Sequence, residues 1–273
     1  MSIFDAEEPG RRGRRAASSQ RVEQRRAIMP EMKLYRDEGI VLRTRDLGEA
    51  DRIITFFLRS HGRTDAVAKG IRRTKSRFGA RLEPFSLVDV QLYRGRSLDI
   101  ITEVATLDAF GQLIADNFEA FTAANAMAET AQRLVAEGVG DRGQYRLLLG
   151  ALNSLARSGH EPTMVADSYF LRALALSGWE LATDTCATCG RPDQLVAFSV
   201  PAGGFVCAAD APVGAAHPDK SISALLRGLA HGDWTVVDQA PRGARRLAEG
   251  YVAAYLQWHL ERQVKSLHLL RSA

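Results

Sequence analysis

The sequence predicts an α+β protein in which a small β-barrel precedes a helical domain. Between residues 34 and 104, short runs of β-branched and aromatic residues alternate with turn residues, a pattern typical of strands. After Leu107, apolar residues recur at helical spacing instead. A stretch rich in Cys, Gly and Pro, residues 180–215, interrupts this second pattern. Together the three patterns indicate a barrel followed by helices with a small insert among them.

The barrel part of the chain contains several short strand patterns separated by turns. Ser60-His61-Gly62 and Arg94-Gly95-Arg96-Ser97 are the clearest turns. Besides strand patterns from Leu34 onward, the expected strands are 53–58, 65–69, 86–93 and 98–104. Five or so short strands within about 75 residues fit a small closed barrel, and an oligonucleotide-binding (OB) fold is the commonest barrel of that size. An SH3-like barrel fits the same pattern.

Three helices are expected before the insert and at least one after it. The first, residues 117–136, has an apolar face made of Phe118, Phe121, Ala124, Ala128, Ala131 and Val135. A second spans 145–156, and a third runs from Thr163, its expected N-cap, to Gly178. This third helix is apolar on almost all sides, so we expect it at the centre of the core. The last helix, near 243–266, carries one stripe of Leu247, Tyr251, Tyr255 and Trp258.

Composition and charge limit the possible functions only loosely. No apolar run reaches the eighteen or so residues that a membrane span needs. Three unevenly spaced cysteines argue against a disulfide framework and suit a reducing cytoplasm. The net charge is +2 over residues 1–32, +4 over 33–111 and −2 over 112–273. A polyanion would dock at the positive N-terminal part, although a solvated surface with a chance fluctuation explains the same counts.

Residues 1–31 form an Arg-rich segment with few large apolar residues, which we expect to be a disordered basic tail. It lacks the apolar core of a signal peptide. Either translation begins natively at Met32, where a well-patterned segment starts, or the tail is a basic arm that touches nucleic acid.

A cysteine cluster in the insert predicts a zinc site. Cys186 and Cys189 form a C-x2-C-G turn, and Cys207 and Asp210 follow at the spacing of a four-cysteine zinc ribbon. Asp210 is the expected fourth ligand, and His217 is the alternative outside the spacing. A closed site of this kind is structural, holding about one zinc per chain. A metal-free remnant, or cysteines used as small buried apolar residues, would also explain the cluster.

The expected domains are the tail, residues 1–31, an OB-fold domain, residues 32–108, and a helical domain, residues 109–273. A zinc-ribbon-like insert at 184–212 interrupts the helical domain.

No motif for catalysis or nucleotide binding is found. The sequence lacks a P-loop, a dinucleotide-binding glycine motif, H-E-x-x-H and G-x-S-x-G. His259-Leu260-Glu261 reads H-x-E, as in zinc deaminases, but it follows the cysteines instead of preceding them. We therefore expect no catalytic residues and no enzyme. The rival hypothesis is a metal-dependent nucleic-acid-processing enzyme that uses Cys186, Cys189 and Cys207.

A basic segment between two expected strands points to nucleic acid. Six cations occur in thirteen residues without an acidic residue: Lys69, Arg72, Arg73, Lys75, Arg77 and Arg81. On a barrel loop such cations can contact phosphates, and Phe78 among them could stack on a base. The alternative is a solvated loop with Phe78 tucked under the barrel.

Several blocks of this region resemble the N-terminal part of RecO DNA repair proteins. They are Gly48–Thr55, His61-Gly62, Ala68–Arg73, Ser76–Phe78 and Leu82–Phe85. The resemblance begins at Met32 and continues through the cysteine insert to Gln257–Glu261.

The resemblance implies an OB domain, a helical domain and a zinc-ribbon-like insert. It also implies binding of single- and double-stranded DNA and annealing of complementary strands. Contacts with RecR and with the C-terminal tail of single-strand-binding protein would help to load RecA in recombinational repair, at the nucleoid within the cytoplasm. Two features depart from the family pattern: Asp210 stands at the fourth cysteine position, and an Arg-rich extension precedes Met32.

Overall fold

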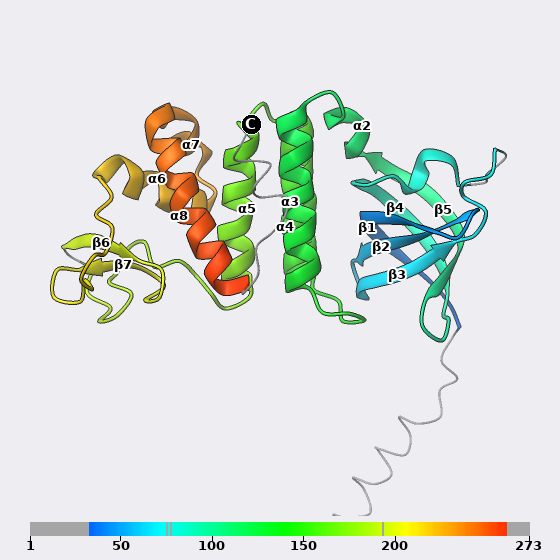
Figure 1. The fold of residues 1–273 in the computed structure, drawn as a ribbon, viewed down its shortest axis with the longest axis horizontal. Coiled ribbons are helices and arrows are strands. Elements are labelled where there is room, and N and C mark those ends of the chain that lie inside the picture. The colour runs from blue at the N-terminus through cyan, green and yellow to red at the C-terminus, as the bar shows by residue number, and fades with distance from the viewer. Residues whose placement is uncertain (1–32, 75, 77, 193, 261–273) are drawn as a thin grey trace, which may run out of the picture. The chain divides into compact units, whose positions relative to one another are not determined.

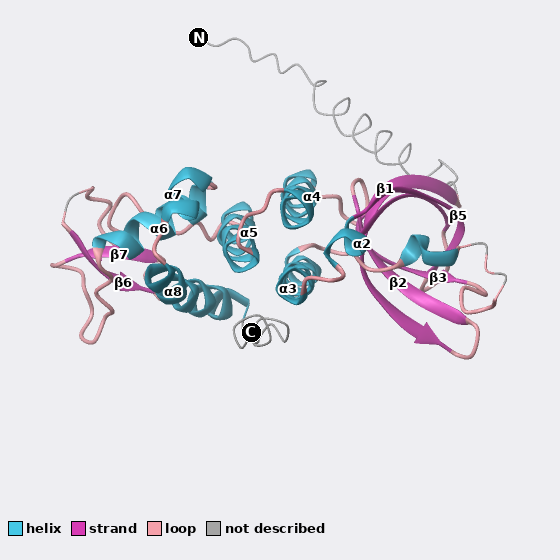
Figure 2. Cartoon of the chain, turned by 90° about the horizontal axis from the view of Figure 1, so that it is seen from above, coloured by secondary structure: helices cyan, strands magenta, loops and turns pink. Residues whose placement is uncertain are grey.

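The computed structural model describes residues 33–74, 76, 78–192 and 194–260. Within them, five strands close into a barrel with neighbours in the order β1-β2-β3-β5-β4, seen along its axis in Figure 2. The strands are β1 (Leu34–Leu47), β2 (Asp51–Leu58), β3 (Gly62–Ala68), β4 (Ser86–Tyr93) and β5 (Asp99–Ala109). β3 and β5 pair in parallel, whereas the β1–β2, β2–β3 and β4–β5 pairs are antiparallel. This order is that of an OB fold, which decides between the two barrels that fit the sequence.

The barrel interior is filled by apolar side chains that occur at every second position along the strands. Val88, Val90 and Leu92 of β4 are fully buried inside it, as their spacing predicts. β2 is buried on both faces. Its Phe56 points into the barrel, while the Phe57 ring packs edge-on against Tyr145 of the helical domain, with centroids 5.4 Å apart. For this reason the sequence of β2 is an almost continuous apolar run.

The helical domain contains seven helices among the described residues. In Figure 1 α5 lies beside α3 and α4, and Figure 2 shows these three as separate neighbours. They are α2 (Phe110–Ile114), α3 (Phe118–Leu134), α4 (Arg142–Arg157), α5 (Pro162–Leu176), α6 (Lys220–His231), α7 (Trp234–Gln239) and α8 (Arg242–Leu260). α5 packs against α3, α4, α6 and α8, which confirms its predicted central place.

The predicted start of α5 was wrong. Pro162 occupies the first turn and Glu161 the N-cap position, so Thr163 lies within the helix. Proline suits a first turn because it lacks the N–H that would find no partner there. Gly178 follows the helix end with a positive φ of 89°, which is why the apolar pattern stops at that point.

The predicted core-facing side of α3 is confirmed in part, because Ala124, Ala128, Ala131 and Val135 are buried. Phe118 and Phe121, however, are 64% and 41% exposed, and Ala120, Ala123 and Met127 face the core as well, so most of the buried positions are alanines. Alanines allow α5 to approach α3 closely, so the buried stripe follows the small residues. In α8, likewise, Tyr255 is buried while Leu247 and Trp258 are exposed.

The barrel and the helical domain meet backbone to backbone beside the β2–β3 turn. The Arg63 N–H donates to the Ala136 carbonyl at 3.2 Å, and the Gly138 N–H donates to the Arg63 carbonyl at 3.2 Å. A Cβ on Gly62 would lie 2.1 Å from the Val139 carbonyl oxygen, and one on Gly140 would lie 2.5 Å from that of Ser60. Both positions therefore require glycine.

The insert is a separate two-stranded antiparallel sheet, β6 (Leu195–Ser199) and β7 (Gly204–Cys207). Its small core contains Cys186, Ala197, Val206 and Cys207. Among the described helices, none has the length and apolar character of a membrane-crossing segment.

Candidate nucleic-acid interface and metal centre

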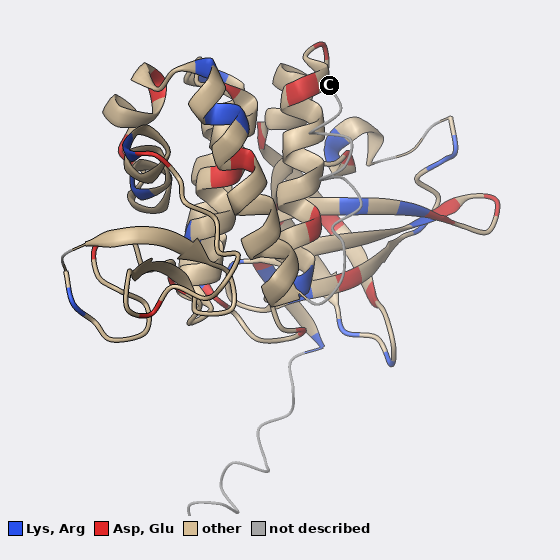
Figure 3. Ribbon diagram, turned by 60° about the vertical axis from the view of Figure 1, so that its left-hand side comes forward, with Lys and Arg blue, Asp and Glu red and all other residues tan. Residues whose placement is uncertain are grey.

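The predicted basic segment, Lys69–Arg81, connects β3 to β4 through a short 3-10 helix, η1 (Gly79–Leu82). The side chains of Lys69, Arg72, Arg73 and Arg81 are exposed. Lys75 and Arg77 lie outside the described residues. Figure 3 shows Lys and Arg in blue, including on loops that leave the barrel.

Apolar anchors and main-chain bonds hold this segment against the barrel. Ile71, Phe78 and Leu82 are buried in the barrel core. The Gly70 N–H donates to Asp51 at 2.7 Å, and the Arg72 N–H donates to the Ala50 carbonyl at 3.0 Å. The segment is therefore attached to the barrel at Gly70–Arg72 and again at Phe78 and Leu82.

The burial of Phe78 corrects its assignment as a stacking residue and favours the alternative, a ring tucked under the barrel. Its side chain is 1% exposed and belongs to the barrel core. Base stacking requires an exposed ring face, so Phe78 serves as an anchor of the segment.

The exposed cations differ in their partners. Arg72 lies 3.4 Å from an Asp46 carboxylate oxygen and donates to the Gly48 carbonyl at 3.3 Å. Lys69 and Arg73 make no ion pair with any described residue. These two side chains can reach a phosphate without first breaking an ion pair with a described residue.

The structure adds three cations that the sequence reasoning missed. Arg43, Arg45 and Arg63 line a cavity of about 150 Å³ on the outer face of the barrel, together with Thr55 and Asp65. A bulge between Val41 and Arg43 shifts the pairing register of β1 and so changes which of its residues face outward. The i, i+2 spacing of Arg43 and Arg45 puts both on one face of a strand, and this pattern could have identified them.

The four predicted metal ligands lie together in the insert. The ligand atoms of Cys186, Cys189, Cys207 and Asp210 are all within 4.8 Å of one another. The Sγ atoms of Cys189 and Cys207 are 3.9 Å apart, and Asp210 Oδ2 lies 3.2 Å from the Sγ atoms of Cys186 and Cys207. Tetrahedral zinc with ordinary bond lengths needs separations of about 3.8 Å between two sulfurs and about 3.5 Å between sulfur and oxygen. The residues present fit such an ion.

Backbone turns bring these ligands together. The Gly190 N–H donates to the Cys186 carbonyl at 2.8 Å, and Gly190 adopts a φ of 73°. The Cys186 N–H donates to the Arg191 carbonyl at 2.7 Å, which closes the turn. The Asp210 N–H bonds the Cys207 carbonyl at 3.1 Å and forms the second turn.

The cluster favours negative charge at two of its ligands. Hydrogen bonds from the thiols of Cys189, Cys207 and Cys186 hold the pKa of Asp210 below its usual value. Burial opposes ionisation of Cys186, but backbone N–H groups outweigh it and lower the pKa of that thiol. The bond to Asp210 and burial instead raise the pKa of Cys207. A metal would displace the Cys207 proton on binding.

The other histidine candidates lie outside this cluster. His217 Nδ1 is 2.9 Å from the Val196 carbonyl oxygen, and His217 is not among the four residues whose ligand atoms lie together. His259 stacks on Trp179, and burial lowers the pKa of its ring. Glu261, the other half of the H-x-E pattern, lies outside the described residues.

Comparisons with known proteins agree with this architecture. The family model "Recombination protein O N terminal" matches residues 32–110, and "Recombination protein O C terminal" matches residues 115–268. The DNA repair protein RecO of Thermobifida fusca (strain YX) is 49% identical over 243 residues, which is 89% of this chain and 100% of that protein. The chain therefore belongs to the RecO family of DNA repair and recombination proteins.

Proposed function

We propose that the chain is a recombination mediator without catalytic activity. It holds single- and double-stranded DNA on the barrel and the basic segment, and it anneals complementary single strands. With RecR and single-strand-binding protein it helps to load RecA, at the nucleoid in the cytoplasm.

The observation that carries this proposal is the row of exposed cations on an anchored backbone, in a protein of the RecO family. Lys69, Arg72, Arg73 and Arg81, together with Lys75 and Arg77, would contact phosphates. Phosphate contacts do not depend on base sequence. They also weaken the repulsion between two strands held on one protein, which favours annealing without an energy source.

The metal centre supports a structural role better than the rival metal-dependent enzyme. Three thiols and one carboxylate fill all four positions of a tetrahedral site, whereas a catalytic zinc keeps one position open. We propose that Cys186, Cys189, Cys207 and Asp210 hold one zinc per chain. The ion would join the C-x2-C turn to the end of β7, because the two-stranded sheet is too small to be stable alone.

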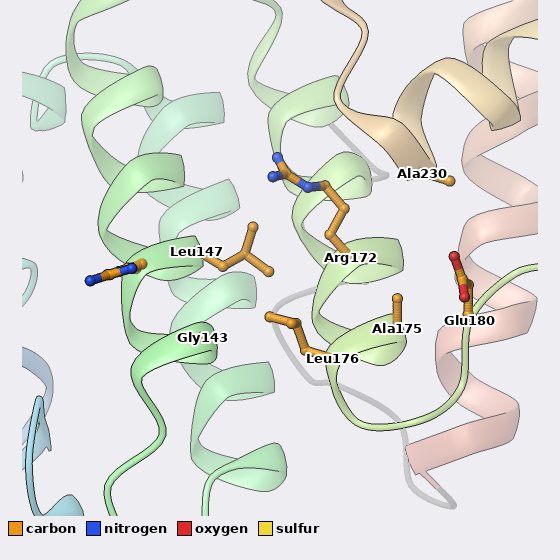
Figure 4. A pocket seen from close by; sticks show the side chains of 8 residues that line it. Gly143, Leu147, Arg172, Ala175, Leu176, Glu180 and Ala230 are labelled. Carbon is orange, nitrogen blue, oxygen red and sulfur yellow. The ribbon is translucent and has the colours of Figure 1, made fainter.

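A groove between α4 and α5 suits the acidic tail of single-strand-binding protein. It encloses about 550 Å³, and Figure 4 shows Leu147 and Leu176 between the two helices with Arg172 nearby. Arg146 and Arg172 are exposed, while Glu180 is the one acidic residue of the described lining. Two cations beside apolar side chains match a peptide that combines carboxylates with apolar residues.

An annealing assay tests the proposed function. Two complementary labelled strands should anneal faster with the protein than alone, with no nucleotide added. The Arg72→Ala/Arg73→Ala variant should lose most of this acceleration, and Arg242→Ala/Arg246→Ala, in exposed positions of α8, serves as the charge-matched control. Equal acceleration by the two variants, or a requirement for ATP hydrolysis by the purified protein, would contradict the proposal.

A further inference from the structure

One end of the barrel contains a small cavity lined by aromatic, charged and hydroxyl-bearing side chains. It encloses about 220 Å³, and we call it the Tyr35 pocket. Its lining includes Tyr35, His61, Thr64, Arg94, Ser97 and Asp99. These residues come from the start of β1, the β2–β3 turn, β3, and the loop that leads into β5. In OB folds, the loop between the last two strands borders the surface that binds oligonucleotides.

Three planar groups meet in this pocket. The rings of Tyr35 and His61 have centroids 4.5 Å apart at an angle of 44°. The Arg94 guanidinium carbon lies 5.4 Å from the Tyr35 ring centroid. Aromatic rings and guanidinium planes are the groups on which proteins stack unpaired bases.

Hydrogen bonds fix these groups in place before any ligand arrives. The Tyr35 hydroxyl donates to Asp99, which also accepts from the Gly95 N–H at 3.0 Å. Burial and the Asp99 carboxylate raise the pKa of Tyr35 far above its usual value, so the hydroxyl keeps its proton. A prepared site loses less conformational entropy on binding.

His61 is fixed from the opposite side. Its Nδ1 lies 2.6 Å from an oxygen of Asp37, whose side chain is 5% exposed and also accepts from the N–H groups of Glu38 and Ser60. The ring is thereby oriented within the wall of the pocket.

The charges favour a base over a phosphate. The cations Arg63 and Arg94 share the pocket with the carboxylates of Asp65, Asp99 and Glu137. A phosphate would be repelled by three carboxylates, whereas a neutral base can bond to hydroxyl and carboxylate groups along its edge. The cavity lined by Arg43 and Arg45 shares Arg63, Asp65 and Glu137 with this pocket, so the two are contiguous. Arg45 and Arg63 are ion-paired with Asp65 and Glu137, whereas Arg43 is exposed and makes no ion pair with a described residue. A DNA strand with one base in the pocket can therefore place its backbone beside Arg43.

We infer that the Tyr35 pocket binds one unpaired nucleobase of a single strand. This inference rests on the proposed DNA-binding function and makes it specific: the basic segment holds phosphates of any DNA, and the pocket selects strands with an unpaired base. Duplex DNA, whose bases stay stacked and paired, would not use the pocket.

The test compares variants on three DNA ligands: a single-stranded oligonucleotide, the same oligonucleotide with abasic sites, and a duplex. Tyr35→Leu and Arg94→Ala should each weaken binding of the base-bearing single strand about fivefold or more. Both should bind the abasic strand and the duplex as the parent does. Tyr35→Phe keeps the ring and should retain most of the affinity, while Tyr93→Ala, at an exposed neighbouring position outside the pocket, is the matched control.

The outcomes separate the inference from the proposed function. If the parent binds none of the DNA ligands, the proposed function fails. If the parent binds DNA and Arg94→Ala keeps full affinity for the base-bearing strand, the pocket assignment is overturned and the function stands. Arg94 is exposed, so its truncation should leave folding intact. Ultraviolet crosslinking of a halogenated-uracil oligonucleotide gives a second readout: crosslinks at Tyr35 or His61 support the pocket, and crosslinks confined to other regions refute it.

Discussion

Removing charge from the basic segment should change the salt dependence of DNA binding, not only the affinity. The variant replaces Arg72, Arg73, Lys75 and Arg77 with alanine. Each phosphate contact on a single strand contributes about −0.7 to the slope of log affinity against log salt concentration. Loss of four contacts therefore flattens the slope by about 2.8. Between about 50 and about 200 mM salt, the parent should lose about fiftyfold more affinity than the variant.

The structure explains why this variant should stay folded. Ile71 and Phe78 anchor the segment to the barrel core, and neither is changed. The bonds at Gly70 and Arg72 that tie the segment to the barrel use main-chain N–H groups. Exposed charges such as those of Arg72 and Arg73 seldom contribute more than about 1 kcal/mol to the free energy of unfolding.

Fluorescence anisotropy with two unrelated oligonucleotides over a salt series measures the slope. A control variant replaces four exposed cations of the helical domain with alanine, namely Arg142, Lys220, Arg242 and Arg246. It changes the net charge equally, so any general effect of charge appears in both variants. A segment variant that is folded and keeps the slope of the parent would refute the assignment of phosphate contacts to this segment.

Three further predictions concern the metal, the core and the partner groove. Protein purified without chelator should contain about one zinc per chain by elemental analysis, and Asp210→Ala should lose more of it than His217→Ala; the reverse ranking would show that the fourth ligand is His217. Phe78→Ala should lower the free energy of unfolding by about 3–5 kcal/mol in urea denaturation, because the ring is buried. A change below about 0.5 kcal/mol, as expected for an exposed ring, would contradict its place in the core. Arg172→Ala should weaken binding of the acidic tail peptide of single-strand-binding protein about tenfold, a cost of about 1.4 kcal/mol, and unchanged affinity would exclude this groove.

The fold class was predictable because local patterns determine it. β4 has the predicted bounds, since alternation of Val88, Val90 and Leu92 is a property of one strand. The face of α3 was not predictable in the same way. Phe118 and Phe121 are the most apolar choice in isolation, yet contact with α5 depends on small residues that let two helices approach. Which face of α3 is buried therefore depends on how α3 and α5 pack together, and the sequence of either helix alone does not determine it.

The same distinction applies to the candidate sites. The ligand set of Cys186, Cys189, Cys207 and Asp210 is visible in the sequence because two short turns contain it. The Tyr35 pocket is not visible, since Tyr35, His61 and Arg94 come from three separate segments that meet only when the barrel closes. Phe78 is an intermediate case, because the sequence allowed either a stacking ring or a buried one and the three-dimensional structure decides for burial.

The two glycines at the junction of barrel and helices have a mechanical consequence. At Gly62 and Gly140 the two main chains are so close that no side chain fits between them. Main-chain hydrogen bonds of Arg63 to Ala136 and Gly138 connect them there as well. A tilt of the β2–β3 turn must therefore carry the segment after α3 with it, because no compressible layer of side chains lies between them. If a DNA strand is bound in the Tyr35 pocket beside His61, tension on that DNA would be transmitted through this backbone contact to the helical domain.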